Sequence, residues 1–153
     1  MCSSDLFHRF TGSDKVLMVP LNSAPPAVAG QVSRLLLEIR TGSDDMRGGN
    51  DNLNIETHFA DGRTQIDNNV NNSAKWNNNT THTVTIVLNK PVPVNQIRSL
   101  TLATTFSGGM GGDNWNMDSL KVTATGVGVN QVIATSGFNR FTGGKKTLNV
   151  ATH

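Results

Sequence analysis

The 153-residue chain lacks the features that mark several common classes of protein. No stretch approaches the roughly 18 apolar residues that a membrane-spanning helix needs, and the apolar run at 16–21 is far shorter. The single cysteine, Cys2, excludes a disulfide or a cysteine metal site within one chain. The 13 Lys and Arg residues are scattered, without a basic run or interleaved aromatic residues, so we expect no nucleic-acid partner.

Catalytic motifs are missing as well. The four histidines do not fall in an HExxH or similar metal-binding spacing, and no nucleophile elbow, P-loop or paired-carboxylate signature is present. The two glutamates, Glu38 and Glu56, occupy strand positions where exposure to solvent is the default. We therefore expect no catalytic residues in this segment, and we expect that it is not an enzyme by itself.

Long helical periodicity is also absent, and apolar and polar residues alternate instead with a period close to two. Leu35, Leu37 and Ile39 share one face of such a run, and Leu120 and Val122 share one face of another. The pattern predicts an all-β fold, an antiparallel β-sandwich of about seven or eight strands. The expected strands lie at 34–40, 52–59, 81–88, 99–106, 118–126 and 130–136.

A short unit occurs twice, once near each end of the chain. Seven residues of the segment 7–17 recur at one constant offset in 138–148, in the order F-x-R-F-T-G followed by Lys and Leu. The unit is either a strand and turn used twice in one sandwich or the end of a preceding copy of the same module. The second interpretation is preferred and predicts four parts. Residues 1–6 resemble translated sequencing-adapter DNA and are an artefact, 7–21 are the tail strand of a preceding repeat module, 22–32 are a Pro/Ala linker, and 33–153 are the sandwich module.

Two loops between the expected strands, 41–52 and 108–116, are rich in carboxylates, amides and glycines. Calcium takes six to eight oxygen ligands from Asp, Asn and backbone carbonyls, and glycines let a backbone turn its carbonyls inward. The alternative is that Asp, Asn and Gly serve only as turn residues. The candidate metal ligands are Asp44, Asp45, Asn50, Asp51, Asn52, Asp113 and Asn114.

Four motifs resemble, in their order, those of the PLAT domain, also called the lipoxygenase-homology or LH2 domain. LLLEIRTGSDDMRGGNDNLNI (35–55) is similar to its first two strands, in which a strand ends in Thr-Gly and a polar loop opens the next. WNMDSLKV (115–122) is similar to its W-x-L-D-x-V-x-V strand, and 75–88 and 94–102 fall in the order of its middle strands. The resemblance covers roughly 33–126, with a first loop one residue tighter than usual, so a distinct bacterial relative of the PLAT sandwich stays open.

The resemblance implies a non-catalytic, jelly-roll-like sandwich that brings an attached secreted or surface enzyme to membrane lipid or to a protein partner, often with calcium (Ca2+) in the end loops. A cation held by acidic side chains can bridge to anionic headgroups, while exposed apolar side chains enter the interface. Met46 and Met110 lie in the two loops and are candidates for such apolar tips; the alternative is that each packs against the end of the sandwich.

Two other functions also fit the sequence. A carbohydrate-binding sandwich would stack Trp76 or Trp115 on sugar rings and would use the many Asn side chains to bind hydroxyl groups. Trp115 precedes an alternating strand and is expected in the core, which leaves Trp76 as a candidate ligand contact. A structural repeat of an extracellular, adhesin-like protein would suit the repeated unit.

Overall fold

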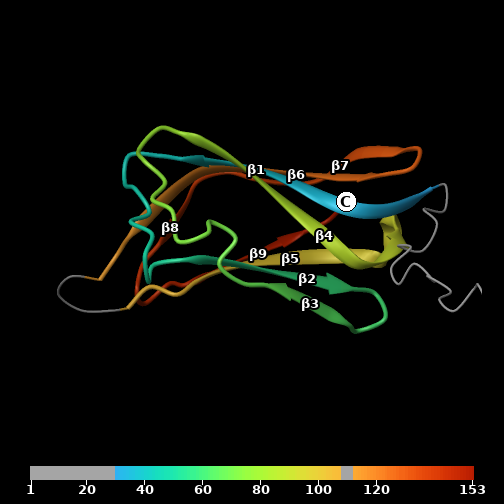
Figure 1. The fold of residues 1–153 in the computed structure, drawn as a ribbon, viewed down its shortest axis with the longest axis horizontal. Helices are drawn as coiled ribbons and strands as arrows, with labels where there is room; N and C mark the ends of the chain where they lie inside the picture. The colour runs from blue at the N-terminus through green and yellow to red at the C-terminus, as the bar shows by residue number, and fades with distance from the viewer. Residues whose placement is uncertain (1–29, 108–111) are drawn as a thin grey trace, which may run out of the picture.

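The computed structural model describes residues 30–107 and 112–153, which form two antiparallel sheets packed face to face (Figure 1). The first copy of the repeated unit, most of the expected linker and Met110 lie outside the described residues. The strands are β1 Gln31–Thr41, β2 Leu53–Phe59, β3 Thr64–Asp67, β4 Thr81–Pro93, β5 Ile97–Thr104, β6 Trp115–Gly126, β7 Val129–Ser136, β8 Asn139–Phe141 and β9 Thr147–Ala151. A short 3₁₀ turn, Val94–Gln96, joins β4 to β5.

The five-stranded sheet has the order β4-β1-β6-β7, with β8 also paired to β6, and the four-stranded sheet has the order β3-β2-β5-β9. The predicted all-β antiparallel sandwich is confirmed. The described strands number nine rather than seven or eight. One that the pattern could not reveal is β3, a run of four residues whose buried side chain is the polar Gln65. No helix in residues 30–107 and 112–153 has the length and apolar character needed to cross a bilayer.

The core lies between the sheets and is built from the inward faces of the alternating strands. Leu35, Leu37 and Ile39 of β1 are fully buried, and Leu120 and Val122 of β6 face the same interior. At one end the core is closed by three large aromatic side chains, Phe106, Trp115 and Phe141, all fully buried. The predicted burial of Trp115 is confirmed, because β6 begins at this residue and turns it inward.

The first strand begins two residues earlier than the expected module boundary. β1 starts at Gln31, and Val32 is fully buried opposite Val92 and Gly126. A Cβ at Gly126 would lie 1.9 Å from the Gln31 backbone oxygen, so only glycine permits this close pairing. Residues 31 and 32, assigned to the linker 22–32, therefore belong to the sandwich.

Candidate functional site

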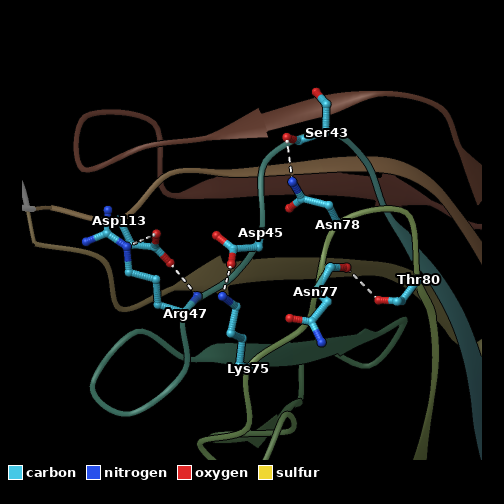
Figure 2. Close-up of polar contacts among 8 residues, drawn as sticks. All are labelled: Ser43, Asp45, Arg47, Lys75, Asn77, Asn78, Thr80 and Asp113. Carbon is cyan, nitrogen blue, oxygen red and sulfur yellow. Dashed lines mark hydrogen bonds and ion pairs between the residues drawn. The ribbon is translucent and has the colours of Figure 1, made fainter.

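The two polar loops meet at one end of the sandwich, opposite the β6–β7 turn (Figure 1). We call this the loop end; it consists of residues 42–52, 68–80 and 112–114. The Arg47 backbone N–H donates to Asp113 Oδ2 at 2.8 Å, and Arg47 Nε lies 3.1 Å from Asp113 Oδ1 (Figure 2). These two contacts hold the acidic loop after β1 against residues 112–114, which directly precede β6.

Asp113 is the most enclosed acidic group of the loop end, with a side chain 2% exposed. Burial raises the pKa of the Asp113 carboxyl, and the nearby Asp51 carboxylate adds to that rise. The Arg47 backbone hydrogen bond and the Arg47 charge act in the opposite direction and lower the same pKa. The ionised form of Asp113 therefore depends on Arg47, because a buried carboxylate is costly without a cation or a donor.

Two acidic residues of the loop after β1, Asp44 and Asp45, also have basic partners. These partners come from distant parts of the chain. Asp45 Oδ2 lies 2.5 Å from Lys75 Nζ, as Figure 2 shows, and Asp44 Oδ2 lies 3.0 Å from Arg140 Nη2. Arg140 also donates through Nη1 to Asn116 Oδ1 at 2.7 Å. Each of these carboxylates already has a positive partner, so a metal ion would have to compete for it.

The asparagines of the first loop hold the loop itself. Asn52 donates through Nδ2 to the Gly49 carbonyl at 2.9 Å and accepts a hydrogen bond from Asn71 Nδ2 at 3.1 Å. The Asn50 carbonyl accepts a hydrogen bond from Thr105 Oγ1 at 2.6 Å. These oxygens are occupied in the described conformation, which gives Asn50 and Asn52 a turn-forming role whether or not a metal binds.

Asp51 differs from the other candidate acids. Its carboxylate makes no hydrogen bond or ion pair with the residues that the structure describes, yet it is close enough to Asp113 to raise that group's pKa. Asn114, the remaining candidate, is half-buried, and its backbone N–H lowers the pKa of the Asp113 carboxyl. Within 30–107 and 112–153, no three His, Cys, Asp or Glu side chains converge as a metal site would require. A cation at this end would therefore rely on two carboxylates, with amide and backbone oxygens completing its shell.

Two predicted ligand contacts are wrong, since Met46 is fully buried and Trp76 is 4% exposed. Met46 and Trp76 form an antiparallel bridge, with backbone N–H to carbonyl distances of 3.1 and 2.9 Å. Trp76 also stacks on His82 with centroids 4.5 Å apart and meets Trp115 edge-on. The bridge folds the Asn-rich segment 68–80 over the end of the core, so neither tryptophan offers a face to a sugar ring and Met46 cannot act as an exposed tip.

Sequence reasoning missed the cations and one exposed aromatic residue. Arg47 lies inside the acidic loop and could have been noticed, whereas Lys75 and Arg140 reach their partners only through the fold. Phe138 is 66% exposed, more than any other large apolar side chain in the described part of the chain. It directly precedes β8, the strand that carries Arg140 to Asp44.

No family model matches the chain, and no curated protein matches it. Among solved structures, the alpha-toxin of Clostridium perfringens superposes with a TM-score of 0.62 at 21% identity, over 81% of this chain and 33% of the toxin. The alpha-toxin of Clostridium absonum gives 0.61 at 15% identity, over 91% and 34%.

A coral 8R-lipoxygenase, described as activated by calcium through a C2-like domain, gives a TM-score of 0.51 at 15% identity, over 78% of this chain and 17% of the enzyme. The chain thus spans about a third of the two toxins and about a sixth of the lipoxygenase. At these identities the similarity concerns the fold. It agrees with the sequence motifs: the chain folds as a PLAT-like β-sandwich.

Proposed function

We propose that this chain is a non-catalytic module that binds membrane lipid through its loop end and directs an attached secreted or surface enzyme there. The observation that carries the proposal is the gathering of three ion pairs at one end of a PLAT-like sandwich, made by side chains of the three loops and by Arg140 of β8. The fold supports it, since the similar structures include toxins and a lipoxygenase in which a domain of this size is part of a larger protein.

Three basic side chains, two in the loop end and one on the adjoining strand β8, suit a phosphate-bearing headgroup. Arg47, Lys75 and Arg140 are each about half exposed and each lies beside a carboxylate. A lipid phosphate can replace a carboxylate as the partner of a guanidinium or an ammonium group with similar geometry. Anionic headgroups near a membrane surface also attract such cations over a Debye length.

The proposal includes calcium at Asp51 and Asp113, with Asn114 and backbone carbonyls completing an oxygen shell. The Asp51 carboxylate makes no ion pair or hydrogen bond with the described residues, and Asp113 is held by Arg47. Calcium at this position competes with the Arg47 guanidinium for Asp113. The displaced guanidinium, already 55% exposed, then becomes available to a lipid phosphate.

Phe138 supplies the apolar contact in this scheme, in place of the buried Met46. Arg140, two residues further on, reaches Asp44 of the acidic loop, so the exposed Phe138 lies two residues from a cation that pairs with this loop. An exposed aromatic ring beside cations is the combination that enters the headgroup region of a bilayer.

Vesicle flotation tests the proposal. Phosphatidylcholine vesicles with and without phosphatidylserine are mixed with the chain in about 1 mM calcium, the range of extracellular calcium modules, or in a chelator. We expect flotation with the anionic vesicles in calcium, loss of it in Asp51→Asn, and retention in Asp61→Asn, whose exposed carboxylate pairs with Arg63 in the β2–β3 turn at the other end. Flotation unaffected by the chelator would overturn the calcium part alone. No flotation under any of these conditions would overturn the lipid-binding function.

A further inference from the structure

β4 is the longest edge strand in the described part of the chain, and one of its sides faces away from the sheet. It pairs with β1 on its other side and ends the five-stranded sheet. The Thr80 carbonyl, just before β4, accepts a hydrogen bond from the Thr41 N–H of β1 at 2.8 Å. The Val87 carbonyl and the Asn89 N–H point the opposite way, to Gln65 of β3. Even-numbered residues of β4 therefore turn their backbone groups toward β1 in this part of the strand, and odd-numbered residues turn theirs outward.

Gln65 covers one part of this outward edge by taking the place of a strand. Its Nε2 donates to the Val87 carbonyl at 2.9 Å, and its Oε1 accepts from the Asn89 N–H at 2.9 Å. These are the two bonds that a neighbouring backbone would make. The last part of β4 also contains a bulge, Lys90 and two prolines. Bulges, charges and prolines keep a sheet edge from pairing with another chain, so this half of the edge is protected.

The first half of β4 has none of these devices. Residues 81–88 contain no Lys, Arg, Asp or Glu and no proline, and the side chains of Thr83 and Thr85 are exposed. The outward N–H and carbonyl groups of Thr83 and Thr85 make no hydrogen bond with any residue that the structure describes. A row of free backbone donors and acceptors at strand spacing is a template for another strand.

This open edge borders a groove of about 430 Å³. The groove is lined by residues 83–86 of β4 and by residues 66–70 and 72, which form the end of β3 and the loop after it. Asn68 and Asn72 are exposed, and their side-chain amides make no hydrogen bond within the described ranges. At a rise of roughly 3.3 Å per residue, the four lining residues of β4 offer about 13 Å of edge. The groove therefore has room for one short extended segment.

We propose that this groove binds an extended peptide segment of a partner protein, which adds to β4 as a further strand of its sheet. The peptide backbone pairs with the N–H and carbonyl groups of Thr83 and Thr85, as the Gln65 amide pairs with the next part of the edge. A groove of this volume takes a single segment, whereas the edge of a second copy would bring a whole sandwich with it. The inference concerns the edge of the sheet and goes beyond the lipid-binding function.

The lining also indicates which side chains the peptide carries. Side chains of a strand alternate between two faces, so one set lies beside the exposed Thr83 and Thr85 and the other enters the groove beside Asn68 and Asn72. Threonine suits the first set as a cross-strand partner, and an amide suits the second. The Asp67 carboxylate accepts a hydrogen bond from the Gln65 amide at 3.0 Å but has no basic partner among the described residues, which favours a Lys or Arg in the peptide.

A synthetic peptide tests this pairing on the full chain. It has about seven residues, alternates threonine with glutamine and ends in lysine. Amide hydrogen exchange is followed by NMR in a chelator and without vesicles, so that binding of calcium or lipid does not contribute. We expect the amides of Thr83 and Thr85 to exchange at least about tenfold more slowly in the complex, because each then donates to the peptide backbone. No slowing at these two amides would overturn the proposal.

Two N-methylated versions of the peptide are controls for each other. Residues directly opposite Thr83 and Thr85 share their face and turn their own N–H groups toward β4, so these are the threonines of the peptide. Methyl groups on the threonine nitrogens are expected to weaken binding at least about tenfold, and methyl groups on the glutamine nitrogens to leave it unchanged. Equal binding of the two versions would exclude pairing through the backbone.

A variant of the chain removes one donor from the open edge. Thr85→Pro deletes an N–H that is outside the β1 ladder, and we expect at least about tenfold weaker peptide binding. Thr85→Val keeps this N–H and should bind as the wild type does. The methylated peptides are measured on the wild-type chain, so they decide the question even where Thr85→Pro does not fold. Self-association of the chain that Thr85→Pro abolishes would also overturn the proposal, because the edge would then pair with a second copy.

Discussion

Arg47→Ala tests what holds the two acidic loops together. The change removes the guanidinium 3.1 Å from Asp113 but keeps the backbone N–H that donates to the same carboxylate at 2.8 Å. Removing one partner of a fully buried ion pair costs about 3–5 kcal/mol, and an exposed pair contributes about 0–1 kcal/mol. Asp113 is 2% exposed and Arg47 is 55% exposed, so we expect an intermediate loss of about 1–2 kcal/mol at pH 7.

The same variant has a defined dependence on pH. Burial already raises the pKa of the Asp113 carboxyl above 3.8, and loss of the guanidinium raises that pKa further. A carboxyl whose folded-state pKa is raised destabilises the fold when it ionises, so this cost is absent at low pH and appears as the pH rises. The penalty of Arg47→Ala is therefore full above the raised folded-state pKa and shrinks as the pH falls through it.

Urea unfolding, monitored by tryptophan fluorescence in the presence of a chelator that removes metal ions, measures this loss of stability. The control is Arg47→Ala made in an Asp113→Asn background, where no carboxylate is left to stabilise. We expect a coupling energy of about 1–2 kcal/mol at pH 7 that is smaller at pH 4. A penalty that is equal at the two pH values, or unchanged in the Asp113→Asn background, would refute the account of Asp113.

Three further predictions follow from the core and the loop end. Phe141→Ala is expected to destabilise the fold by about 3–5 kcal/mol, because it empties a fully buried site stacked on Trp115, and chemical denaturation measures this. Calcium is expected to raise the thermal midpoint of the wild-type chain, because a ligand that binds only the folded state stabilises it, by about 2.7 kcal/mol at 100 times its Kd. An equal rise in the Asp51→Asn variant would show that the ion binds elsewhere. Phe138→Ser is expected to weaken vesicle flotation, whereas Val127→Ser, which is 50% exposed in the β6–β7 turn at the opposite end, is not; equal effects would remove Phe138 from the membrane contact.

The alternation of apolar residues was sufficient to predict the sandwich, because that signal is local. Leu53 and Ile55 of β2 and Leu100 and Leu102 of β5 are buried on the face that a period of two assigns to them. β3 escaped prediction because its buried residue is Gln65. That side chain is fixed by the Val87 carbonyl and the Asn89 N–H of β4, a pairing between the edges of two sheets.

The sequence predicted that acidic residues occur at the loop end, but it did not predict which basic residues pair with them. The sequence pattern located the acidic residues. The basic residues that pair with Asp44 and Asp45, Arg140 and Lys75, lie far from them in the sequence. Trp76 was misjudged for a similar reason. It lies in an Asn-rich segment without alternation, where Asn69, Asn72 and Asn79 adopt positive φ and turn the backbone back over the core.

The ion pairs of the loop end also decide how calcium and lipid depend on each other in the proposed function. Calcium cannot gain Asp113 without losing the contact between Asp113 and Arg47, so part of its binding energy is used to release the guanidinium. A lipid phosphate that takes the released guanidinium returns part of that energy. Calcium and anionic lipid must then strengthen each other's binding by the same factor, because coupling between two sites is reciprocal. Calcium measured without vesicles will therefore bind more weakly than calcium measured with them, and in Arg47→Ala, which has no guanidinium to release, this difference is expected to diminish.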